Sequence, residues 1–290
     1  MSTVNTPPTP PPPPPPPAPG PTPTARSTTP LATPAPPIPF TLAGHRALRW
    51  GGNAERALLA IHGMSGHKAD PMVEAVARGA TLAGWATISV DLPGHGERHD
   101  REALTPWGYR EELAEAAREV SAAHGHVALF ACSLGAFMAL HALAETPLEQ
   151  ALFASPLVDM EAFIARKMSL QGISERELRA RHHVALADGQ SLDWGYFTWV
   201  RRHPLHWHHP TSVMYGSSDA IIPRPDIDSF TRATGAQLQV IRAGHYLNRP
   251  RDLAVLRRWV TGHLLRRDDV PAGAPAGAPA GAPAGAPAAH

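Results

Sequence analysis

The chain has very little cysteine and no long apolar run. Its one cysteine among 290 residues, Cys132, cannot form an internal disulfide, so nothing indicates an oxidising compartment. No apolar run approaches the length of a membrane span, and the N-terminus has neither the basic nor the apolar region of an ordinary signal peptide. We therefore expect a soluble, cytoplasmic protein that makes no membrane contact.

An excess of charge of either sign is also missing. The 26 Lys and Arg residues nearly balance the 25 Asp and Glu residues, which leaves a formal net charge of +1. No run of Lys or Arg suggests a polyanionic partner. Binding of nucleic acid is therefore not expected.

Both ends of the chain lack the large apolar residues that a core needs. Residues 1–38 are rich in Pro, Thr and Ala, and residues 270–290 repeat Pro-Ala-Gly-Ala. Proline donates no backbone hydrogen bond, so we expect a disordered N-terminal arm and a disordered C-terminal tail. Such segments are usually solvated spacers, but a proline-rich arm can also recruit a protein partner with an aromatic groove.

Residues 39–269 alternate apolar strand-like runs with helix-like segments. Strands that are apolar on both faces and separated by helices predict a mostly parallel, doubly wound α/β sheet covered on both sides. Residues 40–52 are interpreted as an antiparallel hairpin at the sheet edge. The expected strands begin at Arg56, Ala86, His126, Gln150, Thr211 and Gln237, and the main helices span 70–85, 109–125, 135–144 and the segment that carries Leu253 to Leu264.

Residues 158–210 interrupt this alternation. They separate two strands by some fifty residues and contain the capping-box pattern Ser174-Glu175-Arg176-Glu177, which indicates a helix start. We interpret the segment as a helical cap inserted between strands of one domain.

Polar residues follow several of the predicted strands. Ser133 follows the strand that begins at His126, while Asp219 and His245 follow the last two strands. Ligand sites in open parallel sheets lie at the carboxyl ends of the strands, so these side chains are expected to meet. Serine, aspartate and histidine in this chain order match a nucleophile, acid and base.

The residues around Ser133 favour a nucleophile over a packed core serine. A hydroxyl that projects above the sheet needs a sharp turn from strand to helix, and the close packing at that turn tolerates only small residues two positions away. Ala131 and Gly135 meet this condition. The backbone N–H groups that follow lie at a helix N-terminus, where an oxyanion is stabilised.

Five motifs in order resemble the α/β-hydrolase fold superfamily, in its esterase and serine aminopeptidase-like branch. ACSLG resembles the nucleophile turn, although Ala131 stands where glycine is commoner. HGMSGHK resembles the oxyanion loop and VDLPGHGER the glycine-rich stretch after the next strand. YGSSDAIIP and AGHYL resemble the acid and base turns.

The resemblance implies a role for each matching residue. Ser133 is the nucleophile, His245 the general base and then acid, and Asp219 the group that orients the imidazole. The backbone N–H groups of Met64 and Leu134 form the oxyanion hole, with the Met64 side chain packed nearby. This chemistry uses no cofactor and no metal.

The roles have rivals in the sequence. Asp159 is the alternative acid, and Asp91 is expected to stabilise its own turn. Cys132 is expected to be a buried, inert thiol. His95 is interpreted as structural or at the rim of the site, and His263 as exposed on the terminal helix.

The cap raises two further alternatives. Its aromatic residues form either a small core of their own or a surface that contacts substrate; they are Trp194, Tyr196, Phe197 and Trp199. The histidines of HPLHWHHP (His206, His208 and His209), and equally His182 and His183, lack the spacing of metal ligands, so a connection from cap to core is the preferred interpretation.

The function expected is hydrolysis of a small-molecule carboxylic ester or thioester through an acyl-enzyme. A serine aminopeptidase-like amide hydrolase would need an acidic group to hold a free amine, and the cap offers Glu161, Glu175, Glu177 and Asp193. A non-catalytic α/β-hydrolase scaffold that acts as a binding protein is the third alternative.

Overall fold

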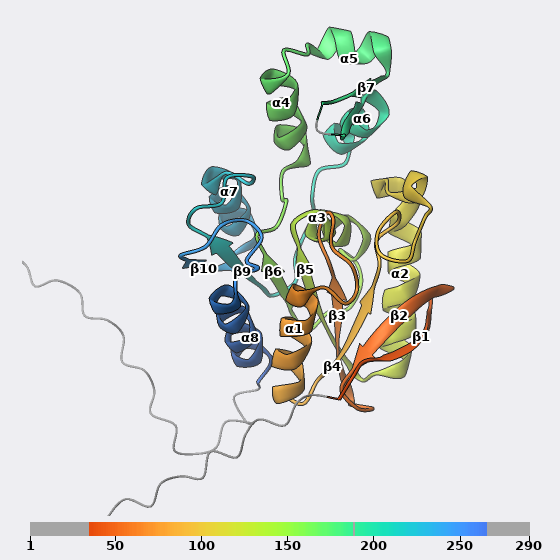
Figure 1. The fold of residues 1–290 in the computed structure, drawn as a ribbon, viewed down its shortest axis with the longest axis vertical. Coiled ribbons are helices and arrows are strands. Elements are labelled where there is room, and N and C mark those ends of the chain that lie inside the picture. The colour runs from red at the N-terminus through yellow and green to blue at the C-terminus, as the bar shows by residue number, and fades with distance from the viewer. Residues whose placement is uncertain (1–34, 188, 266–290) are drawn as a thin grey trace, which may run out of the picture. The chain divides into compact units, whose positions relative to one another are not determined.

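The computed structural model describes residues 35–187 and 189–265. Most of the predicted arm (1–38) and all of the predicted tail (270–290) lie outside these residues, although Ile38 already belongs to the first strand. The described residues contain an eight-stranded sheet, a two-stranded sheet and the helices that pack on them (Figure 1).

The large sheet has the order β1-β2-β4-β3-β5-β6-β9-β10. The pairs β1–β2 and β2–β4 are antiparallel and the remaining neighbours are parallel, so the predicted edge hairpin and the predicted mostly parallel sheet are confirmed. Its strands are β1 (Ile38–Leu42), β2 (His45–Trp50), β3 (Arg56–Ile61), β4 (Ala86–Val90), β5 (His126–Cys132), β6 (Ala151–Ala154), β9 (Thr211–Gly216) and β10 (Gln237–Ile241).

Apolar side chains on both faces of the central strands build two separate cores. Along β3, Leu58 and Ala60 face one core, and Leu59 and Ile61 face the other. The first core contains residues of α1 (Pro71–Leu82) and α8 (Pro250–Leu264), which pack against each other (Figure 1). The second contains residues of α2 (Pro106–Ala123), α3 (Ser133–Ala142) and α7 (Arg224–Thr234). Because the central strands are buried on both faces, their sequences are nearly continuous apolar runs.

Side-chain caps define several helix starts. The Asp70 carboxylate accepts a hydrogen bond from the Val73 N–H, and Pro71 follows at the first helical position of α1. The Thr105 hydroxyl caps α2 in the same way, so this helix begins at Pro106, three residues before the predicted start. In the cap, the Ser174 hydroxyl accepts from the Glu177 N–H, as the capping-box pattern predicts.

The segment between β6 and β9 forms the cap. It contains α4 (Met160–Leu170), α5 (Glu175–Arg181) and α6 (Trp194–Arg202), which lie together in Figure 1. A short antiparallel hairpin, β7 (His183–Ala185) and β8 (Ser191–Asp193), joins α5 to α6. The sequence pattern predicts only helices here, so the hairpin is a difference from that prediction. A 3₁₀ turn, η1 (Arg101–Ala103), precedes α2, and no helix among the described residues is long and apolar enough to cross a membrane.

Candidate active site

Three side chains from distant parts of the chain form one hydrogen-bonded row. His245 Nε2 lies 2.9 Å from Ser133 Oγ, and His245 Nδ1 lies 2.8 Å from Asp219 Oδ2. The side chains of Asp219 and His245 are both buried. An ionised carboxylate can only accept, so Nδ1 carries the proton and the lone pair of Nε2 faces the serine hydroxyl. The row can therefore take a proton from Ser133.

The turn at Ser133 has the sharp geometry expected of it. Ser133 has φ 47°, in the left-handed region, between the end of β5 and the start of α3. A Cβ atom at Gly135 would lie 2.1 Å from the His62 carbonyl oxygen, so only glycine fits where α3 passes the end of β3. A Cβ atom at Gly63 would lie 3.1 Å from Ser133 Cβ. Glycine at positions 63 and 135 thus lets the loop after β3 pack closely against the start of α3, next to Ser133.

Asp219 and His245 meet because their loops are bonded to each other. The Ser217 N–H donates to the Ile241 carbonyl at 2.8 Å, and the Ser218 N–H donates to the Ala243 carbonyl at 2.9 Å. A Cβ atom at Gly216 would lie 2.6 Å from the Ala243 carbonyl oxygen, so glycine is needed where the two loops cross.

The Asp219 carboxylate is buried yet held in its charged form. Burial by itself would raise the pKa of Asp219. The hydrogen bonds from His245 and from the backbone N–H groups of Ile222 and Ile221 outweigh it and hold the pKa below its ordinary value. A charged Asp219 can stabilise a protonated imidazole.

The loop after β3 supplies one side of the predicted oxyanion hole. The Gly66 N–H donates to the Gly63 carbonyl at 3.1 Å, and Ser65 has φ 62°, which makes a tight turn around Met64. The Met64 side chain is 43% exposed and so is less packed than the resemblance implied. Leu134 is the second residue of α3, and its N–H belongs to the first turn, where backbone donors have no partner within the helix.

His62 joins this loop to the next one. Its Nδ1–H donates to the Gly63 carbonyl at 2.7 Å, and its Nε2 accepts from the Leu92 N–H at 2.9 Å. The ring is fully buried, and burial lowers its pKa to about 4. A neutral imidazole is required, because a protonated Nε2 could not accept the bond from Leu92. The HGMSGHK motif alone does not indicate this role of His62.

Asp91 stabilises its own turn, as expected, and also binds a lysine that the sequence analysis did not single out. Its carboxylate accepts from the Glu97 N–H at 3.0 Å and from the Lys68 N–H at 2.7 Å. Lys68 Nζ lies 2.5 Å from Asp91 Oδ2 and 2.9 Å from Glu97 Oε2. A Cβ atom at Gly96 would lie 2.4 Å from the Asp91 carboxylate. This buried ion pair links the loops after β3 and β4.

The rival residues have other partners. The Asp159 carboxylate caps α4 by accepting from the Ala162 N–H at 2.8 Å. Cys132 is buried directly before Ser133, and burial raises the pKa of its thiol far above the ordinary value. The His95 ring donates to the Pro93 carbonyl at 2.9 Å within its own turn. In the described residues, the hydrogen bonds of Asp159 and His95 thus go to backbone groups of their own turns, and the Cys132 thiol is buried.

The cap aromatics divide into two groups. Phe197 is only 2% exposed and packs against the half-buried Trp194, with the Arg201 guanidinium over its ring, so these two aromatics contact each other within the cap. Tyr196 stacks on Phe137 of α3, with ring centroids 6.4 Å apart. The core alternative is thus favoured for Phe197 and Trp194.

Trp107 is a contact residue that the sequence analysis missed. Its ring centroid lies 6.0 Å from Tyr196 and 6.1 Å from Trp199, and Trp199 also packs edge-on against His141. Helix α6 therefore rests on the start of α2 and on α3. The only sequence signal for this contact is a tryptophan directly after the capped Thr-Pro start of a helix.

The four acidic residues that could bind a free amine are already engaged. Arg201 binds Glu161 at 2.7 Å and Glu175 at 2.9 Å. Glu177 pairs with Arg181 at 2.9 Å, and the Asp193 carboxylate caps α6 through the Tyr196 N–H, at 2.7 Å. All four carboxylates thus have partners inside the cap.

The histidine-rich segment between α6 and β9 connects cap and core. His209 Nε2 lies 2.9 Å from the Ala144 carbonyl oxygen, and the Trp207 indole N–H donates to the Thr211 hydroxyl at 2.7 Å. Within residues 35–187 and 189–265, no group of three or more His, Cys, Asp or Glu side chains is placed to hold a metal ion.

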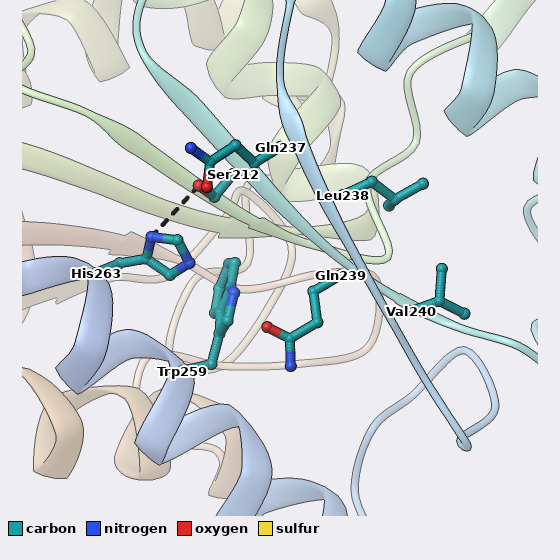
Figure 2. Close-up of a pocket in the computed structure, with 7 residues that line it drawn as sticks. All are labelled: Ser212, Gln237, Leu238, Gln239, Val240, Trp259 and His263. Carbon is teal, nitrogen blue, oxygen red and sulfur yellow. Dashed lines mark hydrogen bonds between the residues drawn. The ribbon is translucent and has the colours of Figure 1, made fainter. Parts of the chain in front are cut away.

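A cavity of about 400 Å³ lies away from the Ser133 row, beside the edge strand β10 (Figure 2). His263 lines it and lies 3.4 Å from Ser212 Oγ, so this half-buried histidine is not exposed as the sequence analysis had expected; burial lowers its pKa. Ser212 and Gln237 mark the beginnings of β9 and β10, whereas Ser133, Asp219 and His245 follow strand ends. The lining residues are Ser212, Gln237, Leu238, Gln239, Val240, Trp259 and His263.

Solved structures with a similar fold include proteins of several kinds. Alpha/beta hydrolase domain-containing protein 10 from mouse is 15% identical, with a TM-score of 0.64 over 79% of this chain and 98% of that chain. Est1E from Butyrivibrio proteoclasticus, with ferulic acid bound, is 17% identical, with a TM-score of 0.65 over 78% and 97%. An esterase from Pyrococcus furiosus is 14% identical, with a TM-score of 0.56 over 79% and 89%. At these identities the similarity establishes the fold.

No curated protein matches the sequence. The model of the Alpha/beta hydrolase family matches residues 58–289, which is most of the chain and includes Ser133, Asp219 and His245. The parallel sheet with its antiparallel edge, the cap after β6 and the turn at Ser133 agree with this match. The chain belongs to the Alpha/beta hydrolase family.

Proposed function

We propose that this protein is a serine hydrolase that cleaves a carboxylic ester or thioester through an acyl-enzyme. The observation that carries the proposal is the hydrogen-bonded row of Ser133, His245 and Asp219, with 2.9 Å and 2.8 Å between its members. Distances of this size meet the requirement for a nucleophile, a base and an orienting group. Membership of a hydrolase family supports the proposal.

The first half of the reaction forms the acyl-enzyme. Ser133 Oγ attacks the substrate carbonyl carbon while His245 Nε2 takes the hydroxyl proton, and Asp219 stabilises the imidazolium that results. The carbonyl oxygen becomes an oxyanion, which the backbone N–H groups of Met64 and Leu134 bind. When the tetrahedral intermediate collapses, the bond to the leaving group breaks and His245 gives that group the proton.

The second half repeats the chemistry with water. His245 Nε2 takes a proton from a water molecule as its oxygen attacks the acyl carbon. Collapse of this intermediate breaks the bond to Ser133 Oγ, which recovers its proton from His245. The products are a carboxylic acid and an alcohol or thiol, and the enzyme returns to its starting protonation state.

Exposed apolar side chains beside these residues support an apolar acyl group. Met64 is 43% exposed and follows Gly63, which closely approaches Ser133. Tyr246 is 62% exposed and lies against the His245 ring, with centroids 5.4 Å apart. Large exposed apolar groups next to a reactive serine favour substrates with an apolar part.

An aminopeptidase-like activity has less support. A free amine needs an unpaired carboxylate near the reacting carbonyl, and the four candidates in the cap are engaged by arginines or by a helix N-terminus. Esters are therefore expected to be cleaved faster than amino-acid p-nitroanilides of comparable size.

Turnover of p-nitrophenyl esters of increasing chain length tests the proposal. We expect the wild type to hydrolyse them and Ser133→Ala to lose turnover by about 10³-fold or more. Cys132→Ala is the matched control, because it changes the buried neighbour of Ser133 and leaves the row of three intact. Equal turnover by the wild type and Ser133→Ala would reject the proposal.

A further inference from the structure

The segment after His245 contains a leucine in an unusual conformation. Leu247 has φ 47°, in the left-handed region. A branched, bulky side chain there clashes with the backbone, so leucine is rare at such positions. A residue keeps this conformation only where its surroundings compensate for the strain.

The compensation here is burial of the side chain. Leu247 is 1% exposed and belongs to the apolar cluster between the sheet and helices α1 and α8. Its neighbour Tyr246 is 62% exposed. The chain therefore turns inward at Leu247 directly after an outward-facing residue and two positions after His245.

The two sides of the His245 loop are held by different means. On the N-terminal side, backbone hydrogen bonds from Ser217 and Ser218 to Ile241 and Ala243 tie the loop to the Asp219 turn. On the C-terminal side, the buried Leu247 side chain fixes the loop two residues before α8 begins to form at its cap, Arg249. The His245 imidazole lies between these two attachments.

We propose that Leu247 is a positioning residue that anchors the C-terminal side of this loop and so holds His245 within hydrogen-bond distance of Ser133 and Asp219. This inference rests on the proposed function for its kinetic consequences. Leu247 itself touches no reacting atom. Its left-handed backbone accompanies the burial of an apolar side chain two residues after the imidazole.

Substitutions at Leu247 separate the anchor from the backbone conformation. Leu247→Gly removes both the strain and the anchor, Leu247→Asn tolerates the conformation but removes the anchor, and Leu247→Met keeps an apolar side chain of similar volume. We expect the glycine and asparagine variants to lose up to about 100-fold in kcat, the loss that a displacement near 1 Å can cause. Their KM for the ester should stay near the wild-type value, and Leu247→Met should retain most of the turnover.

Leu256→Ala is the matched control. Leu256 is fully buried in the same apolar cluster, on α8. Its truncation should lower Tm about as much as Leu247→Asn and leave kcat unchanged. If the Leu247 variants lower Tm and leave kcat unchanged, Leu247 is a core residue only and the inference is overturned.

Hydrogen exchange followed by mass spectrometry gives a readout that does not depend on catalysis. In Leu247→Gly, the amides of residues 242–249 should exchange faster than in the wild type, while in Leu256→Ala the same peptide should change no more than the rest of the chain. Unchanged exchange of this peptide in Leu247→Gly would refute the anchor. Absence of ester turnover by the wild type would instead refute the proposed function, so the two failures are distinguishable.

Discussion

Protonation of the buried His62 ring is expected to destabilise the fold below neutral pH. The ring donates to the Gly63 carbonyl and accepts from the Leu92 N–H, and it can do both only while neutral. Burial lowers its pKa from 6.5 to about 4. The unfolded chain therefore binds a proton near pH 6.5, while the folded chain binds it only near pH 4.

The sign and the size of the effect follow from this difference. Between pH 6.5 and 4 the unfolded state holds more protons than the native state, so the free energy of unfolding falls as pH falls. Between pH 7 and pH 5 the expected loss from His62 alone is about 2 kcal/mol, and the full difference in pKa corresponds to about 3 kcal/mol. The effect is complete well below pH 4 and absent well above pH 6.5.

Urea unfolding at pH 7 and pH 5, followed by tryptophan fluorescence, measures this loss. His62→Gln removes the titrating ring. Between pH 7 and pH 5 the free energy of unfolding should therefore fall by about 2 kcal/mol less in this variant than in the wild type. The variant should also be less stable at pH 7, because an amide does not reproduce both hydrogen bonds. His99→Gln, which replaces an exposed histidine, is the matched control. An identical pH dependence in the wild type and His62→Gln would refute the reasoning.

Three further substitutions test the packing around the site. Gly135→Ala is expected to abolish stable folding or activity, because a Cβ atom there would lie 2.1 Å from the His62 carbonyl oxygen. A variant with the wild-type Tm and full turnover would contradict this close approach. Asp91→Asn leaves Lys68 with Glu97 as its carboxylate partner and should cost up to about 3 kcal/mol in urea unfolding, whereas a cost near zero would mean that the Lys68–Asp91 pair does not stabilise the fold. Phe197→Ala should lower the free energy of unfolding by about 3–5 kcal/mol, less any relaxation of the cap. If Phe197 were a substrate contact, the variant would instead raise KM without changing stability.

Much of the fold could be predicted because each strand is apolar on both faces. The runs that begin at Arg56, Ala86 and His126 became β3, β4 and β5, since a parallel sheet covered on both sides needs such strands. Helix α7 was missed. It buries only Ile227 and Phe230, and its other positions are mostly polar, so its apolar period is weak.

The proposed nucleophile, acid and base could be located because each lies in the turn that follows a strand. The topology then determines that Ser133, Asp219 and His245 share one edge of the sheet. The Lys68–Asp91 pair could not be predicted in the same way. Two loops 23 residues apart in sequence meet there, and no local pattern in either one specifies the contact.

The cap was the least predictable part. Its aromatic residues alternate between its own interior, as for Phe197, and the contact with Trp107 and Phe137 that seats it on α2 and α3. Which aromatic faces which surface depends on how α6 docks, and helical spacing alone does not determine that. The hairpin β7–β8 has strands of three residues each, too short for an alternation pattern to be visible.

The most direct test of the account is labelling with a fluorophosphonate, followed by peptide mapping in a mass spectrometer. The hydrogen-bonded row predicts one adduct on the peptide that contains Ser133, no adduct in Ser133→Ala and much slower labelling in His245→Gln. A wild-type protein that hydrolyses esters but carries the label elsewhere, or labels equally fast without the His245 imidazole, would contradict the assignment of Ser133 as the nucleophile.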